Sequence, residues 1–200
     1  MTRWSELAGA QSGASYAARI TAMAATGQDM HGEATFCSAI VTPPASILDA
    51  GCGTGRVAIR LNELGYDCVG VDLDESMLGV ARHTAPDMRW LIGDLATLEL
   101  GERFDLIVAA GNVIPLLAVD TLDAAVANLA RHLQPTGALV TGFGLDSAHL
   151  PPGCPITLLA DFDTACVAAD LTLRARYSTW DRQIFEGEQG GYAVSIHSPS

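Results

Sequence analysis

The sequence predicts an α/β fold that is built on a mostly parallel β-sheet. From residue 46 onward, short apolar runs of strand length alternate with stretches of helical periodicity. One of these strands runs into a turn in which Gly51, Gly53 and Gly55 alternate with other residues, and a helical stretch follows directly. The chain has 200 residues, of which 49% are hydrophobic and 17% charged. It is therefore long and apolar enough to form one domain with a sizeable core.

The expected elements follow one another in a regular order. We expect strands over 46–50, 67–71, 88–92, 104–109 and 138–143, and helices over 56–64, 74–83, 121–133 and 158–169. Asp74 or Ser76 is the expected cap of the second helix, and the run Gln134–Gly137 is a helix stop signal. Two late alternating stretches, 173–180 and 192–197, predict an antiparallel hairpin, because the linker between them is short and contains several glycines.

The first 45 residues form a segment of their own, which is rich in alanine. We expect it to be helical, with interruptions at its glycines, and to end at Pro43 and Pro44, because proline disfavours helix in the preceding residue. The glycines are Gly9, Gly13, Gly27 and Gly32. Since this segment precedes the sheet, we expect residues 1–45 to form a helical cap or lid over the core of the same single domain, residues 46–200.

Charge and composition restrict the possible partners. The net charge is −12, which disfavours nucleic acid and anionic membrane surfaces, because both are bound through clusters of Lys and Arg. The N-terminus lacks the apolar region of a signal peptide, and no apolar run is long enough to span a bilayer. The five cysteines are scattered and form no C-x-x-C pair. These features predict a cytoplasmic protein with reduced thiols and no bound metal.

The most informative stretch is Ile47–Arg56, which reads I-L-D-A-G-C-G-T-G-R. A strand that leads through a glycine turn into a helix brings backbone N–H groups close to a ligand. The third glycine comes one residue earlier than in the dinucleotide pattern G-x-G-x-x-G. Asp49, at the strand end, would repel a pyrophosphate but not the ammonium or sulfonium group of a methionine derivative. The alternative is a turn that only connects a strand to a helix.

This stretch resembles motif I of the class I S-adenosylmethionine-dependent methyltransferases. The resemblance covers nearly the whole chain after residue 45 and implies S-adenosyl-L-methionine as the cofactor. It also implies a Rossmann-like, doubly wound sheet of seven strands, mostly parallel with one antiparallel strand. Within the turn it implies cofactor contacts for Asp49, Gly51, Cys52, Gly53 and Gly55. The side chain of Cys52 has a simpler interpretation, as a small group packed under the loop.

Three further stretches match family motifs in order and spacing. The run V-G-V-D-L-D implies that Asp72, followed by Leu73, binds the ribose hydroxyls, because one carboxylate can accept from both. The run G-D-L implies that Asp94 and Leu95 lie at the adenine. Taken alone, Asp72 and Asp94 could each simply cap the turn that follows.

The run F-D-L-I-V leads into Ala110, Gly111 and Asn112, which the resemblance places beside the methionine part of the cofactor and the substrate. The run Leu133–Ala138 resembles the turn into the fifth strand of the family. One departure narrows the substrate class. Many nucleobase N-methyltransferases carry N/D-P-P-Y/F after the fourth strand, whereas this chain has G-N-V-I. Together with the negative charge, this departure favours a small-molecule acceptor.

Methyl transfer from a sulfonium is an in-line displacement, so the protein mainly positions the acceptor and excludes water. His31 is the candidate general base, because an imidazole titrates near neutral pH. Glu33 is the candidate residue that orients this base or binds a substrate cation. In the alternative interpretation, Asp29 caps a turn and Glu33 favours the first turn of a helix.

Three other polar side chains are weaker candidates. Tyr16 and Arg19 lie one helical turn apart and could reach the cofactor carboxylate, although a solvated helix face fits them equally well. His149 follows the fifth expected strand, where loops of this family often line the substrate pocket, and is a second candidate base. Its alternative is an ordinary exposed loop histidine.

Three functions are compatible with these motifs. The leading hypothesis is methyl transfer from S-adenosyl-L-methionine to a small molecule. The second is a non-catalytic regulatory or partner protein that binds the same cofactor. The third is a nicotinamide-dependent oxidoreductase, which the early third glycine and Asp49 disfavour. Formation of S-adenosylhomocysteine separates the first from the second, and a binding titration with both cofactors tests the third.

Overall fold

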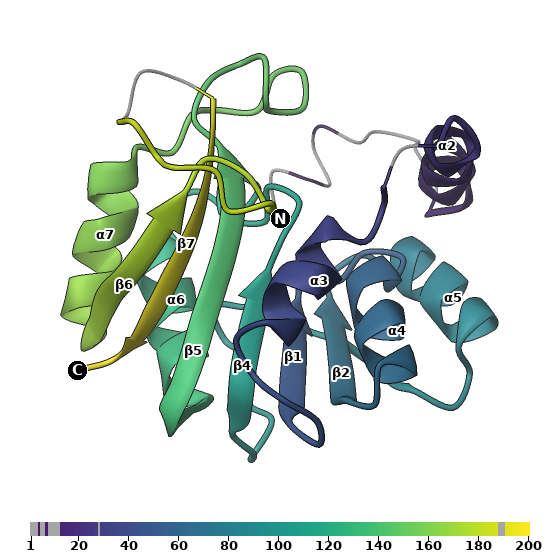
Figure 1. Cartoon of the computed structure of the whole chain (residues 1–200), viewed down its shortest axis with the longest axis horizontal. Coiled ribbons are helices and arrows are strands. Elements are labelled where there is room, and N and C mark those ends of the chain that lie inside the picture. Colours follow the sequence, from purple (N-terminus) through teal and green to yellow (C-terminus); the bar gives the residue numbers. More distant parts are fainter. Residues whose placement is uncertain (1–3, 5–6, 8–12, 28, 188–190) are drawn as a thin grey trace.

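The computed structural model describes residues 4, 7, 13–27, 29–187 and 191–200. Its centre is a seven-stranded sheet in the order β3-β2-β1-β4-β5-β7-β6 (Figure 1). The strands are β1 (Ser46–Ala50), β2 (Asp67–Asp72), β3 (Arg89–Ile92), β4 (Phe104–Ala109), β5 (Leu133–Gly144), β6 (Leu171–Tyr177) and β7 (Tyr192–Pro199). β7 is antiparallel to β5 and β6, whereas the pairings among β1 to β5 are parallel. The predicted mixed sheet with one antiparallel strand is confirmed.

Helices cover both faces of the sheet (Figure 1). The helices of the described residues are α2 (Gly13–Ala25), α3 (Gly32–Ser38), α4 (Arg56–Glu63), α5 (Glu75–Thr84), α6 (Leu122–Arg131) and α7 (Leu159–Ala168). Buried side chains of α3, α4 and α5 pack in one apolar cluster and those of α6 and α7 in another. Asp74 caps α5 as predicted, because its carboxylate accepts from the N–H groups of Ser76 and Met77.

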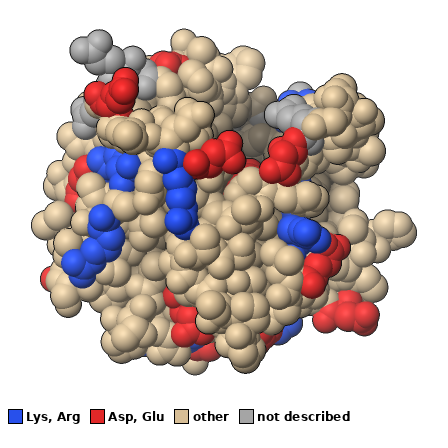
Figure 2. All heavy atoms as spheres, in the orientation of Figure 1, with Lys and Arg blue, Asp and Glu red and all other residues tan. Residues whose placement is uncertain are grey.

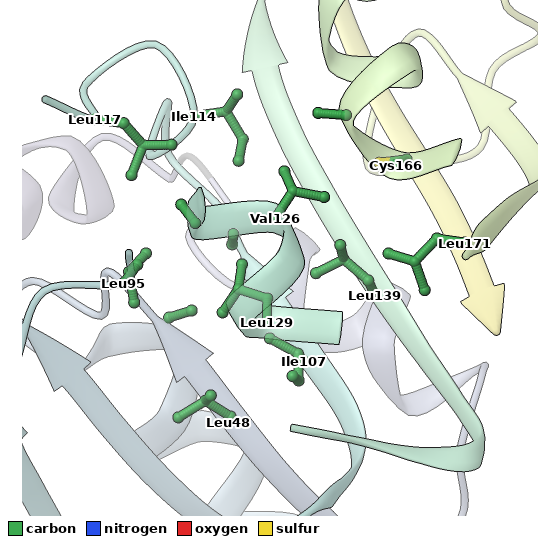
Figure 3. Packing of buried hydrophobic residues seen from close by; sticks show 14 of the residues in the cluster. Leu48, Leu95, Ile107, Ile114, Leu117, Val126, Leu129, Leu139, Cys166 and Leu171 are labelled. Carbon is green, nitrogen blue, oxygen red and sulfur yellow. The ribbon is translucent and has the colours of Figure 1, made fainter. Parts of the chain in front are cut away.

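Successive side chains of the central strands belong alternately to two apolar clusters, one on each face of the sheet. Ile47 of β1 belongs to the cluster that contains Leu61 of α4, whereas the next residue, Leu48, belongs to the cluster that contains Leu129 of α6. Successive side chains of a strand point to opposite faces, and here both faces are covered. Figure 3 shows the second cluster, in which Ile107 of β4 lies next to Leu129.

The bounds of β1 and β4 agree with the sequence prediction, but β5 does not. We expected a helix to Leu133 and a strand that begins at Ala138, whereas α6 ends earlier and Leu133 already pairs with Phe104. The next pair joins Ala138 to Leu106, so the intervening residues 134–137 form a bulge in β5. The residues that were predicted to end the helix, 134–137, therefore lie within β5.

The first strand of the β6–β7 hairpin ends earlier than predicted. β6 ends at Tyr177 rather than Trp180, because the chain turns back and the N–H of Ser178 donates to Gln183 O at 3.0 Å. Trp180 lies in this loop and meets the ring of Phe36 from α3 edge-to-face, with centroids 5.4 Å apart. A residue predicted to be in the strand thus packs against the N-terminal segment.

The N-terminal segment is helical and is interrupted at its glycines, as predicted for the described part. Gly13 and Gly32 begin α2 and α3, and Gly27 follows α2 with φ +86°; Gly9 lies outside the described residues. α2 rests on α5, where the N–H of Gly13 donates to Ser76 Oγ at 3.0 Å. In the described part of the chain, none of the helices is both long enough and apolar enough to cross a membrane.

Candidate functional site

A pocket of about 300 Å³ opens at the carboxyl edge of the sheet, where the strand order reverses between β1 and β4. In open α/β sheets ligands bind at this switch point. Nine of the predicted cofactor residues line it: Tyr16, Gly51, Gly53, Asp72, Leu73, Asp94, Leu95, Gly111 and Asn112. Four others are not among the described lining residues: Asp49, Cys52, Gly55 and Ala110.

The three glycines of the turn differ in what a side chain at each position would meet. Gly53 has φ +54° and faces open space where a side chain would point, so a ligand can approach its backbone closely. Gly51 has φ +76°, and an added Cβ would lie 2.5 Å from Val113 Cγ2. Gly55 also has a positive φ, and its Cβ would collide with the ring of Trp90. Gly55 therefore allows close packing of α4 on the sheet.

The backbone N–H groups of the turn are already used within the protein. Those of Gly51 and Cys52 donate to Val71 O at 2.8 and 2.9 Å, and that of Gly53 donates to Asp72 Oδ2 at 2.7 Å. The expectation that the turn offers N–H donors to a ligand does not hold for these three groups. What the turn contributes to the pocket is the space that its missing side chains leave.

Asp49 and Cys52 are buried beneath the turn. Asp49 is 2% exposed, and its Oδ2 accepts from the N–H of Ala58 in the first turn of α4 at 3.0 Å. Burial raises the pKa of Asp49 to about 7, against the opposing effects of the Ala58 N–H and the Arg56 charge. The Sγ of Cys52 packs near Gly70 of β2. Both side chains support the turn from below rather than facing the pocket.

Asp72 presents its carboxylate to the pocket from the end of β2. Its Oδ2 accepts from Gly53 N at 2.7 Å, and its Oδ1 accepts from Asp74 N at 2.9 Å. Burial raises its pKa, and these two N–H groups act in the opposite direction. Each carboxylate oxygen has a second lone pair. Asp72 can therefore still accept from two hydroxyl groups of a ligand, as the ribose prediction requires.

The end of β3 supplies a polar group and an apolar wall. Asp94 Oδ1 accepts from Ala96 N at 2.9 Å, so this residue caps its turn and also lines the pocket. Leu95 is only 6% exposed and faces the same pocket. Met77, Leu116 and Leu117 also line the pocket and belong to none of the predicted motifs. The apolar run that follows Asn112 was the available signal for the last two.

The end of β4 is fastened to β5 through one side chain. Gly111 and Asn112 have φ of +72° and +70°. Asn112 Oδ1 accepts from Gly144 N at 2.7 Å, and its Nδ2 donates to His149 O at 3.1 Å. The strained backbone of Asn112 is thus held by the end of β5 and by the loop that follows it.

The N-terminal segment closes one side of the pocket. Trp4, Tyr16 and Arg19 all line it. The Trp4 indole N–H donates to Asp74 Oδ2 at 2.9 Å, and the rings of Trp4 and Tyr16 meet edge-to-face at 6.2 Å. The Arg19 guanidinium lies 5.0 Å from the centroid of Tyr16. Trp4 was not predicted as a site residue, because nothing in the sequence near it indicates a contact 70 residues away.

The structure does not bring His31 and Glu33 to this pocket. Glu33 forms a bidentate ion pair with Arg56, in which Nη1–Oε2 is 2.8 Å and Nη2–Oε1 is 2.5 Å, and Arg56 also donates to Met30 O. His31 precedes α3 and lines a separate hollow next to α2 and α4. Its N–H donates to Asp29 Oδ1 at 2.9 Å. The helix-start interpretation therefore describes this segment.

Comparison with known proteins agrees with the geometry. A family model described as "Methyltransferase domain" matches residues 47–137. A TehB-like SAM-dependent methyltransferase from Corynebacterium glutamicum is 35% identical, with a TM-score of 0.84. The match covers 94% of this chain and 98% of that one.

Two curated relatives are also similar. The chain is 36% identical over 119 residues to dTDP-3-amino-3,4,6-trideoxy-alpha-D-glucopyranose N,N-dimethyltransferase of Streptomyces venezuelae, which is 57% of this chain and 50% of that protein. It is 35% identical over 119 residues to dTDP-3-amino-3,6-dideoxy-alpha-D-glucopyranose N,N-dimethyltransferase of Streptomyces fradiae, which is 57% of this chain and 47% of that protein. The chain spans about half the length of these curated relatives.

Proposed function

We infer that this chain, which belongs to the class I S-adenosylmethionine-dependent methyltransferases, transfers the methyl group of S-adenosyl-L-methionine to a small-molecule acceptor. The observation that carries the proposal is the pocket at the switch point, in which residues of four family motifs lie together. The cofactor supplies an electrophilic methyl group. The tasks of the protein are to hold cofactor and acceptor in line and to exclude water.

In this proposal the lining residues contact four parts of the cofactor. Asp72 binds the ribose hydroxyls, and Asp94 with Leu95 contacts the adenine. Gly53 and Gly111 let the backbone approach the methionine part, since both have open space where a side chain would point. Tyr16 and Arg19 face the cofactor carboxylate, a role suited to a guanidinium and a phenol.

We further propose that the acceptor atom is an amine nitrogen of a small polar molecule. The names of both Streptomyces relatives specify N,N-dimethyl transfer to an amino sugar. The net charge of −12 favours a protonated amine as the group that is methylated, whereas the anionic dTDP part of the relatives' named substrates is not carried over to this chain. Figure 2 shows acidic side chains beside the hollow at the upper edge of this face. Nucleic acid is disfavoured as a substrate for the same electrostatic reason.

A cytoplasmic location is part of the proposal. Cys37, Cys52, Cys68 and Cys166 are buried thiols rather than disulfides, and thiols persist in a reducing compartment. His31 keeps its predicted role as a base only if the segment before α3 moves toward the pocket, because its present position faces a different hollow.

The test is a turnover screen with purified protein. The protein is incubated with S-adenosyl-L-methionine and a library of amines and amino sugars, and S-adenosylhomocysteine is measured. Product that depends on one class of amine supports the proposal. Binding of S-adenosylhomocysteine without turnover on any acceptor would favour the non-catalytic alternative. Binding of a nicotinamide cofactor instead would favour the oxidoreductase.

A further inference from the structure

His149 and Asp146 form a hydrogen-bonded pair at the carboxyl edge, in the loop between β5 and α7. His149 Nδ1 lies 2.7 Å from Asp146 Oδ1. Asp146 Oδ2 accepts from Gly191 N at 2.6 Å, and Oδ1 also accepts from Ala148 N and His149 N at 3.0 and 3.1 Å. Gly191 N and the His149 side chain are the main causes that lower the pKa of Asp146 to about 2. The carboxylate therefore stays charged at neutral pH.

The charged carboxylate fixes which imidazole nitrogen faces it with a hydrogen. An ionised carboxylate only accepts, so His149 donates through Nδ1–H, and in the neutral imidazole the lone pair then lies on Nε2. The side chain is 48% exposed, so Nε2 is accessible to a ligand. A carboxylate that holds one imidazole nitrogen while the other takes a proton is the working arrangement of His–Asp pairs in catalysis.

The pair is attached to the wall of the cofactor pocket. Asn112, which lines the pocket, donates to the backbone O of His149 at 3.1 Å, and Pro151, two residues beyond His149, also lines it. The imidazole of His149 is not among the described lining residues, so the pair borders the pocket through the loop that carries it. Asp146 is the charged group that the described contacts bring to the imidazole. From β7, Tyr192 follows Gly191, and burial raises its pKa, so its hydroxyl stays protonated.

We propose that His149 is the proton acceptor for methyl transfer and that Asp146 is its positioning residue. The inference rests on the proposed function and names how this site handles a protonated amine. The substrate ammonium gives one N–H proton to His149 Nε2, which leaves a lone pair on nitrogen. This lone pair forms the N–C bond with the methyl group, while the C–S bond breaks and its electron pair returns to sulfur. The imidazolium, stabilised by Asp146, then releases the proton to water.

The experiment compares two ligands that differ at the transfer point. S-Adenosylhomocysteine has a neutral thioether there, whereas sinefungin has a carbon that bears an amine. The imidazoles of the full-length protein are titrated by NMR in both complexes. A positive charge near His149 Nε2 should lower the pKa of His149 in the sinefungin complex by at least about half a pH unit relative to the other complex. His83, which is exposed at the end of α5, should titrate equally in both.

The variants His149→Gln and Asp146→Asn should lower kcat on the amine found in the screen by about 10–100-fold and leave the affinity for S-adenosylhomocysteine unchanged. Imidazole in the buffer should restore part of the His149→Gln rate, whereas His83→Gln should match the parent. Equal titration of His149 in both complexes, or a shift of His31 instead, would overturn the inference while the methyltransferase assignment stands. If neither ligand binds, the proposed function fails and the inference fails with it.

Discussion

The backbone N–H of Gly53 donates to Asp72 Oδ2 at 2.7 Å, and this contact joins the turn after β1 to the end of β2. The second oxygen of Asp72 holds Asp74 N at the start of α5. One carboxylate therefore sets the positions of two loops that border the pocket. Because Asp72 also lines that pocket, and each of its oxygens has a second lone pair, structure and ligand binding are coupled at this residue.

We predict that Asp72→Ala weakens S-adenosylhomocysteine binding by about 1–3 kcal/mol, the range for loss of a charge-assisted hydrogen bond. Calorimetric titration of folded protein measures this. Asp72→Asn is the matched control: it keeps one acceptor oxygen and should fall between parent and alanine variant. An unchanged dissociation constant in the alanine variant would remove Asp72 from the ribose role.

We predict that Gly53→Val abolishes cofactor binding, because the new side chain would enter the open space that the pocket requires. Gly101→Val is a matched control. Gly101 also has a positive φ, +70°, and open space around it, but it is not among the described pocket residues. Both variants should lose similar stability by thermal unfolding, while only Gly53→Val should lose binding in the titration. Equal binding by the two variants would contradict the placement of the turn.

Asp49→Asn should change how stability depends on pH. The folded-state pKa of Asp49 is about 7, above its ordinary value of 3.8, because burial penalises the charged form. The folded state therefore binds the proton of Asp49 more tightly than the unfolded state. As the pH rises from 4 to 7, ionisation of Asp49 lowers the free energy of unfolding of the protein. Asparagine keeps an acceptor for Ala58 N without a charge. Relative to the parent, Asp49→Asn should gain about 2–4 kcal/mol between pH 4 and pH 8, measured by denaturant unfolding. Parallel curves would contradict the buried charge.

His197 should show the opposite dependence. It is 1% exposed, neither ring nitrogen has a hydrogen-bond partner among the described residues, and Nε2 is 3.6 Å from Asp163. Burial lowers its pKa from 6.5 to about 4, against the opposing charge of Asp163. The unfolded state binds the proton more tightly, so stability falls as pH drops from 6.5 to 4. His197→Phe keeps the ring and should flatten this part of the unfolding curve; an unchanged slope would contradict the assignment.

Much of the fold follows from sequence because both faces of the central strands are covered. The largely apolar strands β1 and β4 end at glycine turns, and their predicted bounds are confirmed. The cap at Asp74 also follows from local chemistry. The bulge in β5 does not, because it depends on how Leu133 pairs with Phe104 on another strand.

The sequence motifs predicted which backbone segments border the pocket. They did not predict which side chains of those segments point into it. Asp72 and Asp49 both lie at strand ends, but Asp72 faces the pocket and Asp49 turns down to Ala58 N. The sequence does not distinguish these outcomes. The placement of Trp4 depends on a tertiary contact with Asp74 that leaves no local pattern.

We predict that the N-terminal segment acts as a lid over the pocket. Gly13 is the buried residue of α2, yet Tyr16 and Arg19 line the pocket and Trp4 is hydrogen-bonded to Asp74. A helix that buries so little contributes little to stability, whereas its contacts at the pocket shield the methyl group from water. S-Adenosylhomocysteine should therefore slow amide hydrogen exchange in α2, as expected for a lid that orders on binding.

Deletion of residues 1–27 removes the lid and tests whether turnover depends on it. The cut must stop before α3, because Phe36 and Cys37 are buried in the core and their loss would unfold the sheet. The shortened protein should keep its circular dichroism and lose less than about 2 kcal/mol of unfolding free energy. Its turnover on the amine found in the screen should fall by at least about tenfold. Parent-like turnover, or hydrogen exchange in α2 that ignores the ligand, would exclude a lid role for this segment.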